Sequence, residues 1–208
     1  MPVIQHLSDT RLSCRTVELP FSSLVDDAAH LRTEIARATE DGPVTVVAHS
    51  YTGITLSLAG HDAQHLVYVA ARMPALGESQ VALNATWGNP EFRSCMVVDD
   101  SGALNLTDDA HRFLFHRSDP NLAHLAMAYR RPMRSEIPVE PIDNPAWLSV
   151  PASYLVCGDD RAVNVDHQRV RAEWAKHSLE IDCDHSPFFS APRDTAAFIA
   201  DTHMAVTR

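Results

Sequence analysis

Hydrophobic residues gather in short continuous runs along the chain, separated by segments with helical spacing. Continuous apolar runs, rather than alternating ones, are typical of strands that are covered on both faces. We predict such strands at residues 44–48, 66–70, 153–157 and 179–183, and a further strand at 12–19 that ends at Pro20. Because these strands alternate with helices, the pattern predicts an α/β fold with a mainly parallel sheet of about five strands.

Helical spacing marks the segments between these runs. Leu24, Ala28, Leu31 and Ile35 recur on one face of a helix that carries acidic residues in its first turn. Further helices are predicted at 54–59, 165–177 and 193–204, and residues 2–10 are interpreted as the end of a helix. The helices are therefore expected to flank the sheet.

The alternation stops between residues 73 and 149. This block contains no buried strand of the same kind, two helices are predicted in it at 108–116 and 121–131, and a proline-rich stretch follows at 137–145. We interpret the block as a helical lid inserted into a single domain that spans residues 1–208. That length suits one hydrophobic core.

Composition narrows the class of protein. Apolar residues make up 45% of the chain, and 17 Lys and Arg against 27 Asp and Glu give a net charge of −10. This charge argues against nucleic acid and anionic membranes as partners, and no apolar run is long enough to span a membrane. The N-terminus shows no signal-peptide pattern, so a cytoplasmic protein is expected. Without C-x-x-C spacing, reduced thiols are expected at Cys14, Cys95, Cys157 and Cys183.

A serine follows the strand predicted at 44–48. Ser50 lies at a predicted strand-to-helix turn, the elbow that exposes a nucleophilic serine in many hydrolases. The G-x-S-x-G pattern places small residues two positions to either side, where this chain has Ala48 and Thr52, with Gly53 one place later. The alternative interpretation is a buried strand followed by a helix whose N-cap is a serine.

Two further polar groups follow predicted strands. A nucleophilic serine requires a histidine base, and that base requires an acid. His185 comes two residues after one predicted strand, and Asp159 and Asp160 come directly after another. Functional side chains gather at the carboxyl ends of parallel strands. The alternatives are a solvated turn for the acidic pair and a hydrogen-bonded loop histidine for His185.

A metal site is not indicated. His61 and His65 stand four residues apart with Asp62 between them, but they lie in a link between a helix and a strand, where no helix face presents both. We expect a surface turn there. No cofactor is expected either.

Four segments together resemble α/β-hydrolases of the bacterial esterase type, related to the plant methylesterase and hydroxynitrile lyase group. They are AHSYTG at 48–53, LVYVAA at 66–71, CGDDRAV at 157–163 and DCDHSPF at 182–188. The resemblance runs from about residue 12 to the C-terminus. It implies Ser50 as nucleophile, His185 as base, Asp160 rather than Asp159 as acid, and the Tyr51 N–H as one oxyanion donor.

This sequence departs from the resembled pattern in three places. Thr52 replaces a glycine, and Ser186 stands where hydroxynitrile lyases have a lysine, which counts against lyase chemistry. A strand and a His-Gly loop that gives the second oxyanion N–H are also absent. That strand lies between those corresponding to 12–19 and 44–48, so unpaired backbone groups are expected on both. The chain is expected to be either a truncated enzyme or a divergent form with inefficient catalysis.

These observations lead to three functional hypotheses. The first is a serine esterase that cleaves small, neutral, rather apolar esters; the second is a weak or inactive relative that binds a ligand or partner; the third is a lyase. Exposed strand edges would favour a homodimer. Six lid residues are considered for the substrate pocket, although we expect most to be packing residues: Met73, Trp87, Phe113, Phe115, Met127 and Tyr129.

Overall fold

A four-stranded parallel sheet forms the centre of the molecule. The computed structural model describes residues 2–10, 12–134 and 140–206. The sheet has the strand order β1-β2-β6-β7. The strands are β1 (Thr45–His49), β2 (His65–Val69), β6 (Ala152–Cys157) and β7 (His177–Ile181). The register places Thr45 opposite His65 in the first pair and Leu66 opposite Ala152 in the second.

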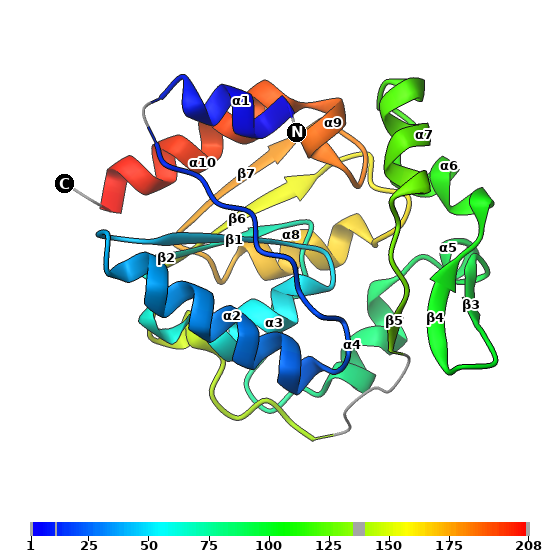
Figure 1. Ribbon diagram of the computed structural model, residues 1–208, viewed down its shortest axis with the longest axis horizontal. Coiled ribbons are helices and arrows are strands. Elements are labelled where there is room, and N and C mark those ends of the chain that lie inside the picture. The colour runs from blue at the N-terminus through cyan, green and yellow to red at the C-terminus, as the bar shows by residue number, and fades with distance from the viewer. Residues whose placement is uncertain (1, 11, 135–139, 207–208) are drawn as a thin grey trace.

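Helices cover both faces of this sheet (Figure 1). One face carries α2 (Leu24–Thr39), α3 (Thr52–Ala59) and α8 (Val165–Ala172). The opposite face carries α1 (Pro2–Ser8) and α10 (Pro192–Val206), and the short α9 (Pro187–Ser190) precedes α10. The sheet thus forms the middle layer of three.

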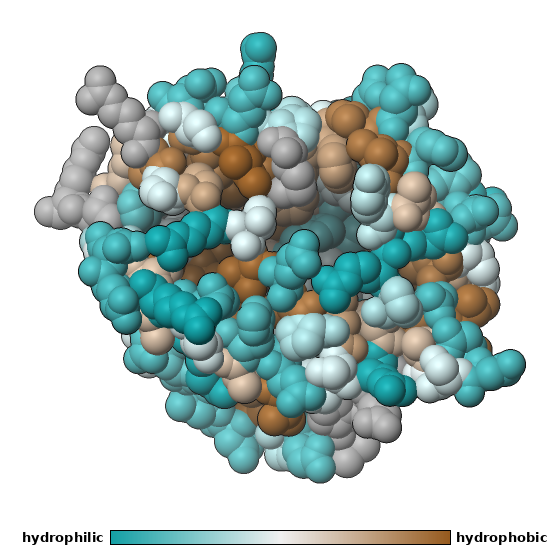
Figure 2. Space-filling view, in the orientation of Figure 1, coloured by the Kyte–Doolittle hydropathy of each residue, from teal (hydrophilic) through white to brown (hydrophobic). Residues whose placement is uncertain are grey.

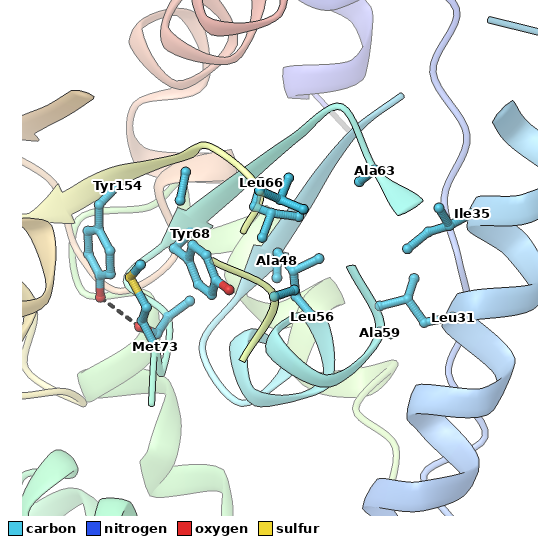
Figure 3. Packing of buried hydrophobic residues seen from close by; sticks show 14 of the residues in the cluster. Leu31, Ile35, Ala48, Leu56, Ala59, Ala63, Leu66, Tyr68, Met73 and Tyr154 are labelled. Atoms are coloured by element: carbon cyan, nitrogen blue, oxygen red, sulfur yellow. Dashed lines mark hydrogen bonds between the residues drawn. The ribbon is translucent and has the colours of Figure 1, made fainter. Parts of the chain in front are cut away.

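The core follows the two-residue period of the strands. In β2, Leu66 and Tyr68 pack toward α2 and α3, whereas Val67 and Val69 pack toward α1 and α10. Figure 3 shows the first of these cores, where Leu31 and Ile35 of α2 meet residues of α3 and β2. Because β2 and β6 are buried on both faces, their apolar residues form the continuous runs seen in the sequence.

Whereas residues 146–148 pack against α3, residues 80–134 lie at one end of the sheet (Figure 1). Their helices are α4 (Gln80–Trp87), α5 (Pro90–Arg93), α6 (His111–Leu114) and α7 (Pro120–Ala128). A small antiparallel sheet of order β3-β4-β5 accompanies them, formed by β3 (Met96–Val98), β4 (Ala103–Leu106) and β5 (Met133–Arg134). Short 3-10 turns lie at Gly60–Asp62, Asp108–Ala110 and Ala146–Leu148. We call residues 73–149 the cap segment.

The structure corrects several sequence predictions. The strand predicted at 12–19 is absent: these residues form no ladder, do not pair with β1, and all but Leu12 and Leu19 are exposed. β-propensity without a partner strand does not make a strand, because water satisfies the backbone groups equally well. The main sheet therefore has four described strands rather than five.

The cap segment was expected to be helical but also contains the small sheet, whose strands are too short for a periodicity signal. Part of the proline-rich stretch lies outside the described residues.

Helix boundaries also shift. The predicted helix at 165–177 ends at Ala172, and β7 begins at His177, because a turn at residues 173–176 leads directly into the strand. The helix predicted at 108–116 is a 3-10 turn followed by α6. None of the described helices is long and apolar enough to cross a membrane.

Candidate active site

Ser50 occupies a sharp turn between β1 and α3. Its backbone φ of 53° lies in the left-handed region, which a residue with a side chain adopts only when its surroundings hold it there. The Ser50 N–H donates to the Val69 carbonyl at 3.3 Å, and its own carbonyl accepts from the Arg72 N–H at 3.0 Å. The end of β2 therefore fixes the turn, and the serine side chain is half-buried rather than enclosed.

Thr52 and Gly53 together occupy the part of the turn where the G-x-S-x-G pattern has one glycine. The Thr52 hydroxyl accepts from the His49 N–H at 2.9 Å and donates to the His49 carbonyl at 2.8 Å, so it clamps the turn. The close approach falls at Gly53, where a Cβ would lie 2.5 Å from the Arg72 carbonyl oxygen. Thr52 is accommodated because the glycine is required one position later.

His185 lies between Ser50 and Asp160. The His185 Nε2 atom is 3.0 Å from the Ser50 Oγ, and its Nδ1 atom is 2.7 Å from the Asp160 Oδ2. The His185 side chain is 3% exposed and that of Asp160 is fully buried. The structure thus brings together the three side chains that the sequence singled out.

Asp160 is held by four hydrogen bonds. Its Oδ1 accepts from the N–H groups of Ala162 and Val163, and its Oδ2 accepts from the Gln168 side chain and from His185. Gln168 is buried in α8, and its Oε1 accepts from the Cys157 N–H at 3.0 Å. These four donors fix the orientation of the carboxylate toward His185. The sequence analysis missed Gln168, since α8 looks polar throughout.

A second buried carboxylate, Asp184, organises the loop before His185. Its Oδ1 accepts from the Ser186 N–H and the Ser190 hydroxyl, and its Oδ2 accepts from the Arg117 N–H and the Ser118 hydroxyl. The carboxylate therefore ties the cap segment to the loop that carries His185. The sequence offers no signal for this role beyond adjacency to His185.

His49 supports His185 from the strand side. Its Nε2 lies 2.7 Å from the His185 carbonyl oxygen, and the two rings are 4.6 Å apart. Burial, and secondly the proximity of His185, lowers the pKa of His49 to about 3. His49 is therefore neutral at pH 7, with its Nε2 proton directed at the loop.

The remaining sequence candidates lie elsewhere. Asp159, the reserve for the acid, pairs with His116 at 3.0 Å on the cap side and does not bond His185. His61 contacts the Asn144 carbonyl, whereas His65 begins β2 and is 2.9 Å from the Ser153 hydroxyl. The surface turn expected at His65 is wrong, because this side chain is fully buried.

The Tyr51 N–H stands at the start of α3, where backbone donors point out of a helix. It donates to no other described residue. The Tyr51 ring turns away toward α2, since its hydroxyl donates to Asp27 at 3.1 Å. Burial, reinforced by that carboxylate, raises the pKa of the Tyr51 hydroxyl.

An apolar groove lies between α1 and α7. Its volume is about 640 Å³, and Figure 2 shows apolar side chains on both sides of the hollow. Its lining includes Ile4, Leu122, Leu125, Tyr129 and Phe189. Phe189 belongs to α9, which directly follows the His185 loop. Of the six cap residues considered for a pocket, Tyr129 lines this groove, whereas Met73, Trp87, Phe113 and Met127 are buried packing residues.

The parallel sheet, the strand-to-helix turn and the Asp160–His185–Ser50 arrangement are the features of an α/β-hydrolase. A sequence model of the alpha/beta hydrolase family matches residues 9–198, and the chain therefore belongs to this family.

Relatives in this family include hydrolases from fungi and plants. The chain is 28% identical over 194 residues to the alpha/beta hydrolase nvfD of Aspergillus novofumigatus, covering 83% of this chain and 75% of that protein. It is 29% identical over 192 residues to methylesterase 7 of Arabidopsis thaliana, covering 78% and 70%. The crystal structure of the Arabidopsis methylesterase MES16 superposes with a TM-score of 0.76 at 17% identity, covering 98% and 92%.

Proposed function

We propose that this α/β-hydrolase is a carboxylesterase that cleaves small esters with Ser50 as nucleophile, His185 as base and Asp160 as acid. The observation that carries the proposal is the continuous hydrogen-bonded chain from the Asp160 Oδ2 through both ring nitrogens of His185 to the Ser50 Oγ. Similarity to methylesterase 7, a protein named for ester cleavage, supports the reaction class.

The geometry suits acyl transfer. The His185 Nε2 takes the Ser50 proton as Oγ attacks the ester carbonyl, and the Nδ1–H donates to Asp160, which stabilises the imidazolium that forms. The Tyr51 N–H, at the positive end of the α3 dipole, donates to the oxyanion. The proton on His185 then passes to the leaving alkoxide, which departs as the alcohol.

Release of the acyl group reverses these roles. His185 takes a proton from water, the resulting hydroxide attacks the acyl carbonyl, and the Ser50 Oγ leaves with the proton returned by His185. The half-buried position of Ser50 leaves a path for this water. No cofactor enters the proposed cycle.

A second candidate is a weak or inactive relative that binds a ligand or a partner. It is favoured by the oxyanion site, because the Tyr51 N–H is the one donor that the motif identifies. Loss of a donor costs about two to three orders of magnitude in turnover. Lyase chemistry is disfavoured by Ser186, which is buried and donates its backbone N–H to Asp184.

Labelling with a fluorophosphonate probe tests the proposal, because the probe reacts only with a serine that a base activates. We expect labelling of the wild-type chain, none of Ser50→Ala, and normal labelling of Ser94→Ala, which alters an exposed serine in the cap segment. Hydrolysis of short p-nitrophenyl esters should follow the same order. Absence of labelling in a folded wild-type protein would contradict the esterase and support the binding protein.

We further propose that the free edge of β1 promotes a homodimer in the cytoplasm. β1 pairs with β2 alone among the described strands, and Val47 on it is 36% exposed. Light scattering on the purified chain tests this, and a monomeric mass would contradict it.

A further inference from the structure

Arg72 is a half-buried cation near Ser50, and no described residue supplies a counter-ion. It follows β2 by three residues, and its backbone N–H donates to the Ser50 carbonyl at 3.0 Å. Its guanidinium donates no hydrogen bond and forms no ion pair with any described residue, and its Nε is buried without a partner. A buried N–H donor without a partner costs free energy, so this guanidinium is a candidate for binding an anion.

The backbone around Arg72 is fixed. The Tyr154 hydroxyl donates to the carbonyl of Ala71 at 2.7 Å, as Figure 3 shows, and Met73 is fully buried in the core. Gly53 packs against the Arg72 carbonyl so closely that no Cβ fits between them. The position of this arginine is therefore set by the same contacts that set the Ser50 turn.

The surroundings of the guanidinium are cationic or neutral. The groups close enough to affect its pKa are Tyr51, from the Ser50 turn, and Arg93, from α5. Burial is the main cause that lowers the pKa of Arg72 to about 10, so the side chain is charged at pH 7. Arg93 is exposed and donates to the Ala85 carbonyl, so it does not neutralise Arg72.

Other buried polar atoms around Tyr51 also lack partners. Thr55 on α3 lies beside the Tyr51 hydroxyl, and the α4 face that bears Trp87 packs with Ile54 and Tyr51 in one cluster. Gln80, Asn84 and Trp87 recur at i, i+4 and i+7, so they share that face of α4. Of the eight buried side-chain atoms without partners among the described residues, five belong to this region: Thr55 Oγ1, Arg72 Nε, Gln80 Oε1, Asn84 Oδ1 and Trp87 Nε1.

We propose that Arg72 is a specificity-determining residue that binds a carboxylate on the ester substrate. A guanidinium matches a carboxylate in geometry and charge. Because Arg72 lies near Ser50, one substrate molecule can present its scissile ester to Ser50 and its carboxylate to Arg72. The polar side-chain atoms of α3 and α4 that lack partners would bind other polar groups of the same substrate. This inference rests on the proposed esterase function and specifies its substrate class.

The substrate proposed here carries a carboxylate, whereas the composition of the chain favours a neutral ester. A net charge of −10 is spread over the surface and screened by salt, whereas a half-buried guanidinium near Ser50 acts on a bound ester at short range and with less screening. The local cation therefore decides the selectivity.

Paired substrates test the proposal. Monomethyl succinate, glutarate and adipate, with the carboxylate on the acyl side, are each compared with the matched primary amide; acetoxyacetate, with the carboxylate on the alcohol side, is compared with acetoxyacetamide. We expect at least one acid to exceed its amide in kcat/KM by tenfold or more. Arg72→Gln should lower kcat/KM for that acid by about 10–100-fold, mainly through KM, and change the amide little. Arg72→Lys should retain part of the preference, and Arg93→Gln should retain it.

Two measurements on the protein itself separate this inference from the esterase proposal. In Ser50→Ala, the preferred acid should raise the melting temperature more than its amide does, and adding Arg72→Gln should remove the difference. This test needs no catalysis, so it stands if fluorophosphonate labelling fails. Arg72→Met should not lower the ligand-free melting temperature, since the guanidinium makes no hydrogen bond or ion pair with a described residue that the change would break. Equal effects on acids and amides, or a melting temperature lowered by Arg72→Met, would overturn the proposal.

Discussion

The two sides of Ser50 differ in how their buried polar groups are paired. On the His185 side, the carboxylates of Asp160 and Asp184 each accept four hydrogen bonds, and both ring nitrogens of His185 have partners. On the Arg72 side, five buried polar atoms have none among the described residues. The comparison teaches that the reacting groups are held in place by the protein itself, whereas the opposite side is completed only when a ligand supplies partners.

The largest expected effect comes from the acid of the paired side. Asp160→Asn should lower kcat by about three to four orders of magnitude, because an amide no longer stabilises the imidazolium and permits the wrong tautomer of His185. The side chain keeps its size, but its NH2 group faces donors, so circular dichroism and urea unfolding are used to show that the variant is folded at the assay temperature. Asp159→Asn is the matched control, since that carboxylate is next in sequence but bonds His116. Comparable losses in the two variants would reject the assignment of Asp160.

The sequence alone predicts that the catalytic candidates follow buried strands, because the signal lies in neighbouring residues of the chain. Buried parallel strands produce continuous apolar runs, and polar residues that follow such runs gather at one edge of the sheet. His185 and the pair Asp159 and Asp160 are predicted in this way, and the family resemblance then selects Asp160. Arg72 obeys the same rule, because it follows β2 just as His185 follows β7, but a cation is not a member of a serine triad and the motif does not single it out.

Other features depend on contacts that no local pattern records. Asp184 binds residues 117 and 118, more than sixty positions earlier, and Gln168 is buried only because α8 packs against β6. The strand predicted at 12–19 had suitable composition but no partner, which shows that pairing and not propensity makes a strand. At the Ser50 turn, Thr52 makes side-chain hydrogen bonds to His49, and the close backbone approach falls at Gly53. The G-x-S-x-G motif assigns that position to a single glycine after the serine, so it does not describe this arrangement.

A second prediction addresses the link between the cap segment and the catalytic loop. Asp184→Asn should reduce the free energy of unfolding by about 2–4 kcal/mol, because an amide accepts fewer hydrogen bonds and its NH2 group faces donors in a buried site. Urea unfolding followed by tryptophan fluorescence measures this change. Asp182→Asn is the control: its exposed pairing with Arg117 should matter little to the urea midpoint. An unchanged midpoint in Asp184→Asn would show that the cap is held by other contacts.

The effect that is smallest at neutral pH concerns His49, because it develops only as the pH falls. The folded pKa of about 3 lies below the ordinary value near 6.5, so the unfolded chain binds a proton that the native chain does not between these limits. The stabilisation from burying neutral His49 is therefore fully present above about pH 6.5 and is lost as the pH falls toward 3. The loss should be on the order of 5 kcal/mol at the acid limit.

His49→Gln tests this dependence, because the glutamine amide can still donate to the His185 carbonyl but does not titrate. Melting temperatures measured from pH 8 to pH 4 should fall less steeply in the variant than in the wild type. His65, whose pKa burial lowers to about 4, provides the comparison. His65→Gln should also flatten the curve, but it should leave fluorophosphonate labelling intact, since this side chain bonds Ser153 at the far end of β2. If His49→Gln runs parallel to the wild type at every pH, then the pKa of His49 does not change on folding, and the permanently neutral donor assigned to the paired side of Ser50 is wrong.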